Sequence, residues 1–334
     1  MDSADRARGF DEIRVGVIGA GAMGSSHVRT LATAVNGATV TAVADVDLER
    51  ARAAAREAGA AGVYADGREL IADPEVDAVL IASIPETHEG LILACLDANK
   101  PVLCEKPLTP SSEASRRVVE AEASTGRRLV QVGFMRRYDR AYLELKRRVD
   151  AGEVGQPLLV HCAHRNADAP IGFAARMAIS DSVVHEIDIV RWLLGQEIVA
   201  ATVVAGRATR YAPADVRDPL LVLLETDGGV LIDVESFVRA RYGYDIRCEI
   251  VGEEGTLFLA PATETAVAEG FEVRFAQAYR DELQAWVDAV DDGRTVAGAG
   301  AWDGYVASAV TDACLKALTS GRREDVLLAA PPTV

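Results

Sequence analysis

A glycine-rich turn near the start of the chain constrains the fold more than any other feature of the sequence. The apolar run Ile13–Ile18 leads directly into Gly19-Ala-Gly21-Ala-Met-Gly24, and a helix-like segment, residues 25–35, follows. A strand, G-x-G-x-x-G and a helix, in this order, are the signature of a dinucleotide-binding unit. The three glycines allow a tight turn, a close approach of the backbone to a pyrophosphate, and close packing of helix on strand. The helix N-terminus attracts the anion, so we expect the cofactor to contact Gly19, Gly21, Ala22, Met23 and Gly24.

The residue after the second predicted strand indicates which dinucleotide binds. Strand 38–44 is followed by Asp45, about twenty residues past Gly24, the spacing at which an acidic residue binds the adenosine ribose. Its carboxylate would accept hydrogen bonds from both ribose hydroxyls and repel a 2′-phosphate, which favours NAD over NADP. Two alternatives stay open: Asp45 could be the N-cap of the next helix, and Arg50 or Arg52 could reach a phosphate.

Strand-like and helix-like segments continue to alternate up to residue 132. The further helices are expected at 47–58, 87–98 and 110–125, and the further strands at 63–64, 77–82, 101–104 and 128–132. Repeated β-α units predict a Rossmann domain, with a doubly wound parallel sheet, over residues 11–132. Ligands of such sheets bind at the carboxyl ends of the strands. We therefore add Ser83, His88, Glu105 and Lys106 to the cofactor site, and we interpret Lys106 as functional, not as a solvated surface charge.

The second half of the sequence has a different pattern. A helix is expected at 140–150, and two helices close the chain at 280–291 and 302–318. Strands are expected at 156–164, 198–205, 220–225, 230–237, 244–251, 256–259 and 271–275. Because few helices separate the middle strands, we predict a large, mostly antiparallel sheet. This gives a C-terminal α+β domain over residues 133–330 for substrate binding and oligomerisation.

One acidic and one histidine side chain of the second half lie at helical spacing. If the segment Asp181–Gly195 is helical, Asp181 and His185 project from one face, one turn apart. A carboxylate beside an imidazole can orient the ring for work as a general base near neutral pH. The alternative is a structural pair with no catalytic role.

Composition excludes several classes of protein. A net charge of −16 opposes binding to nucleic acid, and no apolar run is long enough to cross a membrane. The polar tail Met1–Phe10 lacks the apolar core of a signal peptide. Five widely spaced cysteines predict reduced thiols in the cytoplasm. His161 and His164 would face opposite sides of a strand, so we expect no metal site.

Taken together, these motifs resemble the Gfo/Idh/MocA oxidoreductase family over nearly the whole chain. The family-level marks are the three glycines, Glu105-Lys106-Pro107, and the Asp181 and His185 pair. Further segments are similar to the inositol 2-dehydrogenase branch of that family: Gly133-Phe-Met-Arg-Arg-Tyr-Asp139, His164-Arg-Asn166, His185-Glu-Ile-Asp188, Arg191-Trp-Leu-Leu194 and Tyr242-Gly-Tyr-Asp245.

The resemblance implies an activity and a set of roles. The branch oxidises myo-inositol to 2-keto-myo-inositol (scyllo-inosose) with NAD. His185 would take the proton from the reacting hydroxyl, Lys106 would bind the same oxygen, and Asp181 would bind substrate and couple to His185. The other hydroxyls would be bound by Arg136, His164, Asn166 and Tyr244. The resemblance also implies a homotetramer assembled through the second-domain sheet.

Two other functions stay open. The first is an NAD- or NADP-dependent dehydrogenase of another cyclic polyol or sugar, such as scyllo-inositol or glucose. The second is a cofactor-sensing regulator without catalysis, which the presence of both Lys106 and His185 disfavours. Glu186 and Asp188 receive no role: Glu186 could face the sheet or the cofactor, and Asp188 could pair with an arginine.

Overall fold

The structure is a computed structural model, and it describes residues 12–169, 173–174, 176–213, 216–260, 268–293, 296 and 298–332. The predicted tail Met1–Phe10 lies outside the described residues. The described residues form two compact units. The first takes those up to Gly133 together with Arg280–Gly304 and Pro332, and the second takes those in Phe134–Tyr279 and Tyr305–Pro331. The chain thus returns to the first unit late in the sequence, whereas the predicted domains, 11–132 and 133–330, are continuous.

The first unit is built on a parallel sheet of six strands in the order β3-β2-β1-β4-β5-β6. The strands are β1 (Ile13–Ile18), β2 (Ala38–Ala44), β3 (Gly62–Tyr64), β4 (Ala78–Ile81), β5 (Val102–Glu105) and β6 (Val130–Gly133). The order reverses between β1 and β4, which is the switch point of a doubly wound sheet, where ligands bind. The predicted N-terminal Rossmann sheet is therefore confirmed.

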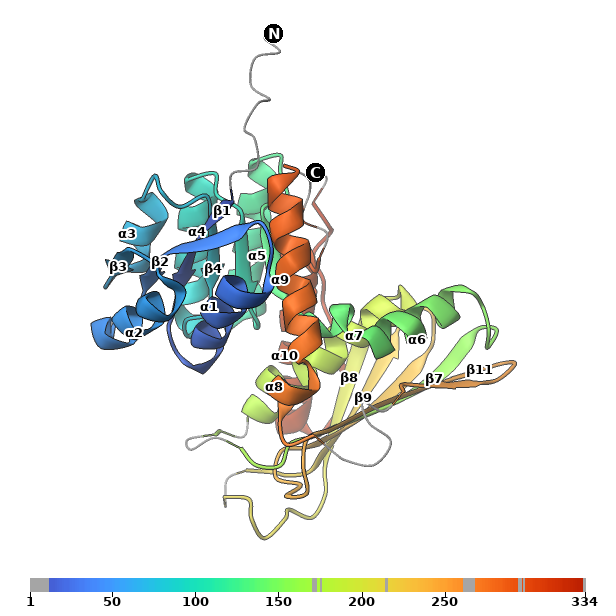
Figure 1. Ribbon diagram of the computed structural model, residues 1–334. Helices are drawn as coiled ribbons and strands as arrows, with labels where there is room; N and C mark the ends of the chain where they lie inside the picture. Colours follow the sequence, from blue (N-terminus) through green and yellow to red (C-terminus); the bar gives the residue numbers. More distant parts are fainter. Residues whose placement is uncertain are drawn as a thin grey trace. The chain divides into compact units, whose positions relative to one another are not determined.

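Helices connect the strands of this sheet (Figure 1). They are α1 (Ala22–Ala34), α2 (Leu48–Ala58), α3 (Gly67–Ala72), α4 (Pro85–Asp97) and α5 (Ser112–Ser124). Side chains cap several of them: Asp47 accepts from the Glu49 and Arg50 N–H groups at the start of α2. Gly59, at φ +72°, ends that helix in the left-handed conformation. The sequence did not predict α3, because six residues are too few to show a helical period.

The core of the first unit lies between the sheet and its helices. Val17, Leu80 and Leu103 are fully buried in the central strands. The late segment of the chain adds to the same core: Trp286 and Val287 of α9 (Ala276–Asp291) belong to this cluster and are 0 % and 1 % exposed.

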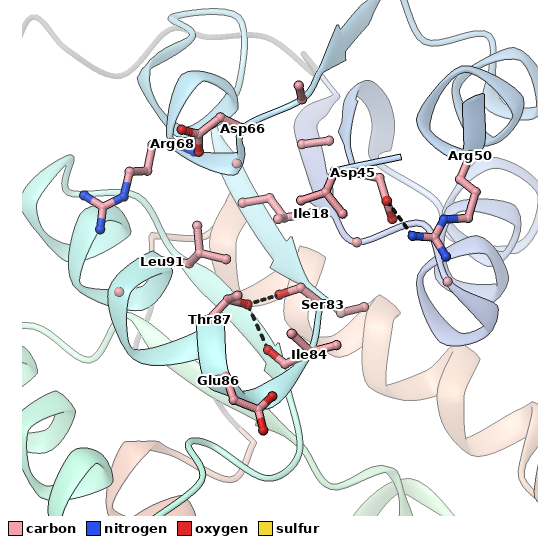
Figure 2. A pocket seen from close by; sticks show the side chains of 18 residues that line it. Ile18, Asp45, Arg50, Asp66, Arg68, Ser83, Ile84, Glu86, Thr87 and Leu91 are labelled. Carbon is pink, nitrogen blue, oxygen red and sulfur yellow. Dashed lines mark hydrogen bonds and ion pairs between the residues drawn. The ribbon is translucent and has the colours of Figure 1, made fainter. Parts of the chain in front are cut away.

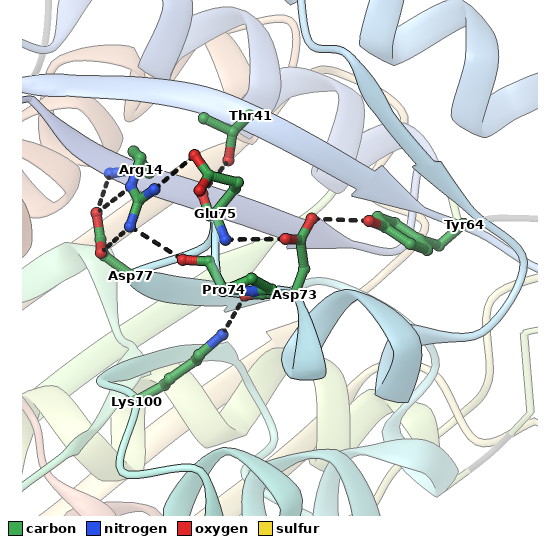
Figure 3. A network of polar contacts seen from close by, with 8 residues as sticks. All are labelled: Arg14, Thr41, Tyr64, Asp73, Pro74, Glu75, Asp77 and Lys100. Atoms are coloured by element: carbon green, nitrogen blue, oxygen red, sulfur yellow. Dashed lines mark hydrogen bonds and ion pairs between the residues drawn. The ribbon is translucent and has the colours of Figure 1, made fainter.

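A polar network ties the amino ends of the central strands together (Figure 3). Arg14 of β1 donates to both oxygens of Asp77 at 2.8–2.9 Å and to Glu75 at 2.7 Å. Asp73 accepts from the Tyr64 hydroxyl at 2.7 Å, and the ammonium group of Lys100 donates to the Asp73 carbonyl at 2.7 Å. The network anchors the loop before β4, at the end of the sheet opposite to the one where ligands bind.

The second unit is built on a seven-stranded sheet in the order β12-β11-β7-β10-β9-β8-β13. The strands are β7 (Pro157–Arg165), β8 (Ile198–Ala205), β9 (Leu220–Thr226), β10 (Leu231–Phe237), β11 (Asp245–Gly252), β12 (Thr256–Phe258) and β13 (Glu324–Asp325). Among these described strands, only β10 and β7 pair in parallel. The prediction of a large, mostly antiparallel sheet is confirmed.

The helical elements of the second unit include one correction. They are a short 3-10 helix, η1 (Met135–Tyr138), α6 (Arg140–Asp150), a π-helical turn, η2 (Ala178–Val183), α7 (Val184–Leu194), α8 (Phe271–Arg274) and most of α10 (Ala301–Ser320). Residues 271–275 were predicted as a strand, which is wrong: Phe275 N–H donates to the Phe271 carbonyl at 2.8 Å, a helical bond. The alternation Phe-Glu-Val-Arg-Phe misled the prediction, since so short a run fits either period.

Side chains of the second sheet alternate between a covered and an exposed face. β9 and β10 show strict alternation in burial, and α7 packs against β7. His164 is 3 % exposed, whereas the side chain of His161 is 43 % exposed and pairs with Asp233. The two histidines therefore face opposite sides of β7, as predicted. Within the described part of the chain, no helix is long and apolar enough to span a bilayer.

Candidate functional site

The glycine turn of the first unit shows a different steric demand at each glycine. Gly19 has φ +93°, and a Cβ there would lie 2.6 Å from the Ala82 backbone. A Cβ on Gly24 would lie 1.8 Å from the Gly19 carbonyl oxygen, whereas one on Gly21 would meet no atom of the described chain within 4 Å. Protein packing thus requires glycine at positions 19 and 24 but leaves open space at Gly21. That open space lies at the N-terminus of α1, where a pyrophosphate fits.

Helix α1 begins at Ala22, three residues before the predicted start, with Gly21 as its N-cap. No side chain of the described residues caps it, so the first-turn N–H groups of Ala22, Met23 and Gly24 have no intrahelical acceptor. These are the residues predicted to contact the cofactor, and their N–H groups suit an anionic one.

Asp45 follows β2 at the same end of the sheet. Its carboxylate accepts from the Ala20 N–H at 2.7 Å and the Asp47 N–H at 2.8 Å, and it pairs with Arg50 at 2.9 Å (Figure 2). Burial favours a higher pKa for Asp45, but these hydrogen bonds and the guanidinium outweigh it and lower the pKa. The group is therefore an ionised acceptor at neutral pH. The N-cap of α2 is Asp47, which excludes the N-cap alternative for Asp45.

A cleft of about 770 Å³ opens beside the glycine turn. Of the predicted cofactor residues, Gly19, Gly21, Asp45 and Ser83 line it (Figure 2). The sequence did not single out two further polar residues on its wall, Asp66 and Arg68, whereas Glu86 and Thr87 lie between the predicted Ser83 and His88. Asp66 and Arg68 follow β3, so the rule that ligands bind at strand ends could have found them. The size, the open space at Gly21 and the ionised Asp45 fit a dinucleotide.

The other residues predicted for the cofactor do not line this cleft. His88 is 1 % exposed, and its ring nitrogens lie 2.9 Å from the Pro107 carbonyl oxygen and 3.1 Å from that of Ser83. Burial lowers the pKa of His88. His88 thus joins the loops that follow β4 and β5.

Glu105 lies at the end of β5 and holds the turn before Lys106. Its carboxylate contacts His27 Nε2 at 2.8 Å and accepts from the Lys106 N–H at 3.1 Å. Burial opposes ionisation of Glu105, but His27 and Lys106 outweigh burial and lower the pKa of Glu105. Lys106 itself is half-buried.

A buried polar cluster, formed by Arg136, His164, Glu186 and Tyr244, lies in the second unit. Arg136 and Glu186 are each 1 % exposed and form an ion pair. Glu186 Oε2 lies 2.9 Å from His164 Nδ1, and the ring of Tyr244 meets that of His164 edge-on at 5.7 Å. Three of the four are predicted substrate residues, and the structure brings these three together. Glu186 is the member that the sequence left without a role.

The predicted catalytic pair of the second unit straddles a change of helix type. Asp181 lies in the π-helical turn η2, half-buried, and accepts from the Ser180 hydroxyl at 3.1 Å. His185 lies in the first turn of α7, 7 % exposed, with its ring 6.2 Å from that of His164. A regular α-helix through both residues was expected. The π-helical turn, with its i→i+5 bonds, replaces its first part.

Asn166 and Asp188 complete the predicted positions. The backbone of Asn166 bonds to Phe237 and Ala240 at 2.9 Å, just past the end of β7, and its side chain is half-buried. Asp188 is 1 % exposed and forms a bidentate pair with Arg137 at 2.9 and 2.5 Å. An arginine partner was one expectation for Asp188, and it is confirmed.

Comparison with known proteins places both halves of the chain in one family. Residues 13–134 match the model of the oxidoreductase family with an NAD-binding Rossmann fold (GFO_IDH_MocA), and residues 142–258 match the GFO/IDH/MocA C-terminal domain. Inositol 2-dehydrogenase 1 of Saccharopolyspora erythraea is 52 % identical over 333 residues, which cover 96 % of this chain and 98 % of that protein.

Solved structures agree with this assignment. Myo-inositol dehydrogenase from Lactobacillus casei, in complex with NAD(H) and myo-inositol, matches with a TM-score of 0.93 at 36 % identity, over 97 % of this chain and 99 % of that one. Scyllo-inositol dehydrogenase from the same organism, with NAD(H) and scyllo-inositol, matches with a TM-score of 0.86 at 25 % identity, over 95 % of this chain and 99 % of that one. The chain therefore belongs to the Gfo/Idh/MocA oxidoreductase family, with an NAD-binding Rossmann domain at its N-terminal end.

Proposed function

We propose that this protein is an NAD-dependent dehydrogenase that oxidises myo-inositol to 2-keto-myo-inositol. The observation that carries the proposal is the similarity, over nearly the whole chain, to proteins named inositol 2-dehydrogenase. The myo-inositol enzyme of Lactobacillus casei is also more similar to this chain than the scyllo-inositol enzyme of that organism. This difference favours myo-inositol over scyllo-inositol as the substrate.

Residues of the first unit would bind NAD, which accepts the hydride when bound. The N–H groups of Ala22, Met23 and Gly24 would bind the pyrophosphate, and Asp45 would accept hydrogen bonds from the ribose hydroxyls. Because Asp45 is already ionised and held in place by Ala20, it would bind the ribose without reorganising. A 2′-phosphate at the same position would meet a carboxylate, so NADP would bind less tightly.

Three residues would act on the hydroxyl that is oxidised. His185 would take the proton as the general base, with Asp181 binding substrate and coupled to it, and Lys106 would stabilise the oxygen as charge develops. Glu105 supports this role of Lys106, because its carboxylate fixes the backbone N–H of that residue at the end of β5.

The buried cluster of the second unit suits a polyol. A ring of hydroxyls needs both donors and acceptors, because each buried hydroxyl left unpaired costs about 1–3 kcal/mol. Arg136 donates only, His164 presents a ring nitrogen, and Tyr244 offers a hydroxyl. With Asn166 they would bind the hydroxyls that do not react.

A substrate and cofactor panel tests the proposal. NADH formation is followed with myo-inositol, scyllo-inositol and glucose, each with NAD and with NADP. We expect the highest kcat/KM for myo-inositol with NAD. Clear turnover of another sugar without turnover of myo-inositol would support the alternative, a dehydrogenase of another cyclic polyol or sugar. A higher kcat/KM with NADP would contradict the role of Asp45.

A matched pair of variants separates binding of NAD from chemistry. Lys106→Ala and His185→Ala should each lower kcat at least about 100-fold, in the range found for acid–base groups. NADH binding, measured by fluorescence, should stay near the wild-type value in His185→Ala. Unchanged turnover in either variant would remove that residue from the mechanism.

The exposed face of the second sheet supports a homotetramer. Leu159, Leu221, Leu223 and Leu231 are 37–53 % exposed. Strand register places them on one face: Leu231 is opposite Leu159, and Leu223 is opposite Asp233, which lies two residues after Leu231. A monomer gains nothing by exposing such a row, and a copy of the same face would cover it. Light scattering after size exclusion tests the assembly: a monomer, or a tetramer that Leu223→Asp leaves intact, would contradict it.

A further inference from the structure

The carboxylate of Glu186 connects two of the residues proposed to bind substrate. One oxygen, Oε1, pairs with the Arg136 guanidinium, and the other, Oε2, lies 2.9 Å from His164 Nδ1. All three side chains are at most 3 % exposed. Glu186 therefore contacts the groups around the site without being accessible to solvent.

Glu186 is ionised in this setting. Burial alone would raise its pKa, but the positive charge of Arg136 and the contact with His164 outweigh burial, and the pKa is lowered. An ionised carboxylate can only accept hydrogen bonds. The contact between Oε2 and Nδ1 is therefore a hydrogen bond only if Nδ1 of His164 carries a proton.

A second neighbour of the same nitrogen does not change this conclusion. Arg136 Nη2 lies 3.2 Å from His164 Nδ1, and a lone pair on Nδ1 could accept from it. That arrangement would place the lone pair 2.9 Å from a carboxylate oxygen, and two acceptors repel each other. The shorter contact, to a full negative charge, favours the Nδ1–H form.

We propose that Glu186 is a positioning residue that holds His164 in the Nδ1–H tautomer, so that Nε2 of the neutral ring is an acceptor for a substrate hydroxyl. The proposal rests on the proposed function for its substrate. The ring of His164 lies between those of His185 and Tyr244, at 6.2 and 5.7 Å. An acceptor at this place complements Arg136, which can only donate.

Glu186→Gln tests the proposal, and Asp188→Asn is the matched control. Glu186 and Asp188 both lie on α7, both are 1 % exposed, and the carboxylate of each pairs with an arginine of η1. Each substitution therefore removes one such carboxylate. In the first variant the amide oxygen would stay on Arg136, and the amide NH2 would face Nδ1 and favour the Nε2–H tautomer. We expect KM for myo-inositol to rise about 10-fold or more, since an acceptor is exchanged for a donor. The dissociation constant of NADH should be unchanged.

The tautomer itself provides a readout that a merely structural role would not change. Protein labelled with ¹⁵N at both ring nitrogens of histidine is studied by solid-state NMR, and the signals of His164 are assigned with His164→Asn, which is practical because the chain has five histidines. We expect a protonated Nδ1 and an unprotonated Nε2 in the wild type and in Asp188→Asn, and the reverse in Glu186→Gln.

Three results would overturn the proposal. The first is an unprotonated Nδ1 or a protonated Nε2 of His164 in the wild-type protein, which needs no variant to fold and no substrate. The second is a protonated Nδ1 in Glu186→Gln. The third is an equal rise in KM for Glu186→Gln and Asp188→Asn. If the wild type oxidises no inositol, the proposed function fails, while the NMR measurement still decides the tautomer.

Discussion

Two glycines of one turn should respond in opposite ways to the same substitution. A Cβ on Gly24 would lie 1.8 Å from the Gly19 carbonyl oxygen and 2.8 Å from its carbon. Gly19 cannot move away from Gly24, because the backbone of Gly19 is already close to that of Ala82. Helix α1 would have to move by more than about 1 Å, and overpacking of this kind costs about 1–3 kcal/mol or more. For a contact this close we take the upper end, about 3 kcal/mol, so Gly24→Ala should lower Tm by roughly 6–12 °C, at about 2–4 °C per kcal/mol for a unit of this size.

Gly21→Ala should keep its stability and lose its cofactor. A Cβ there meets no atom of the described residues within 4 Å, and φ is −70°, which alanine adopts freely. The only cost is the weaker N-cap, about 0.5–1 kcal/mol, so Tm should fall by less than about 4 °C. The added methyl group would occupy the space left for the pyrophosphate. We expect the dissociation constant of NADH to rise about 10-fold or more, which is about 1.4 kcal/mol.

Thermal unfolding followed by circular dichroism, and titration of NADH by fluorescence, measure the two effects separately. Unfolding is followed without cofactor, because bound NADH would stabilise the wild type more than the variant. The reasoning is refuted if Gly21→Ala loses as much stability as Gly24→Ala, or if it binds NADH as tightly as the wild type does.

Three further predictions concern the first unit. Arg14→Met should lower the free energy of unfolding by about 1 kcal/mol, because Arg14 bonds to both Asp77 and Glu75. The variant should leave KM unchanged. Urea titration measures the free energy of unfolding, and steady-state kinetics measures KM. The pKa of Glu105 is lower in the folded protein than the 4.5 of an unperturbed glutamate. Ionised Glu105 therefore stabilises the folded state above pH 4.5, and this stabilisation is lost as the pH falls through the pKa of the folded state. Urea titrations should then show that Glu105→Gln loses more free energy of unfolding, relative to the wild type, at about pH 7 than at about pH 4. An equal loss at both pH values would contradict the prediction. Asp45→Ser should weaken NAD binding about 10-fold, and it should improve NADP binding because Arg50 loses its carboxylate partner and can contact the 2′-phosphate. Calorimetry with each cofactor measures both affinities, and an unchanged affinity for NADP would count against this role of Arg50.

Most of the first unit could be predicted because its signals are local. The glycine spacing, the apolar runs and Asp45 each depend on contacts within a β-α unit, and the parallel sheet and the NAD cofactor are confirmed. The resemblance to the family is confirmed as well. Asp66 and Arg68 of the cleft wall were missed, although they follow the predicted strand 63–64, because the rule that ligands bind at strand ends was applied only to the other strands. The catalytic and binding roles of individual residues stay predictions.

The second unit was harder because local patterns there fit two structures. The segment 271–275 alternates like a strand but forms α8, in which Arg274 pairs with Asp139 at 2.7 Å and stacks on Phe275 at 4.4 Å. The helix through Asp181 and His185 was expected to be regular, but a π-helical turn precedes α7. Residue spacing shows neither of these, because five alternating residues fit a strand or a helix, and a spacing of four residues does not distinguish i→i+4 from i→i+5 bonding.

The roles of Glu186 and Asp188 show where sequence reasoning stops. Nine of the eleven residues of α7 are buried, so the helix has no polar face from which the direction of a side chain can be inferred. Buried charges must be paired, and two adjacent arginines of η1 match two carboxylates of α7 in number. Which pairs with which depends on the fold: Arg136 binds Glu186 and Arg137 binds Asp188. That choice has a chemical consequence, because the carboxylate of the first pair also contacts His164, and the protonation of His164 then follows from the pairing.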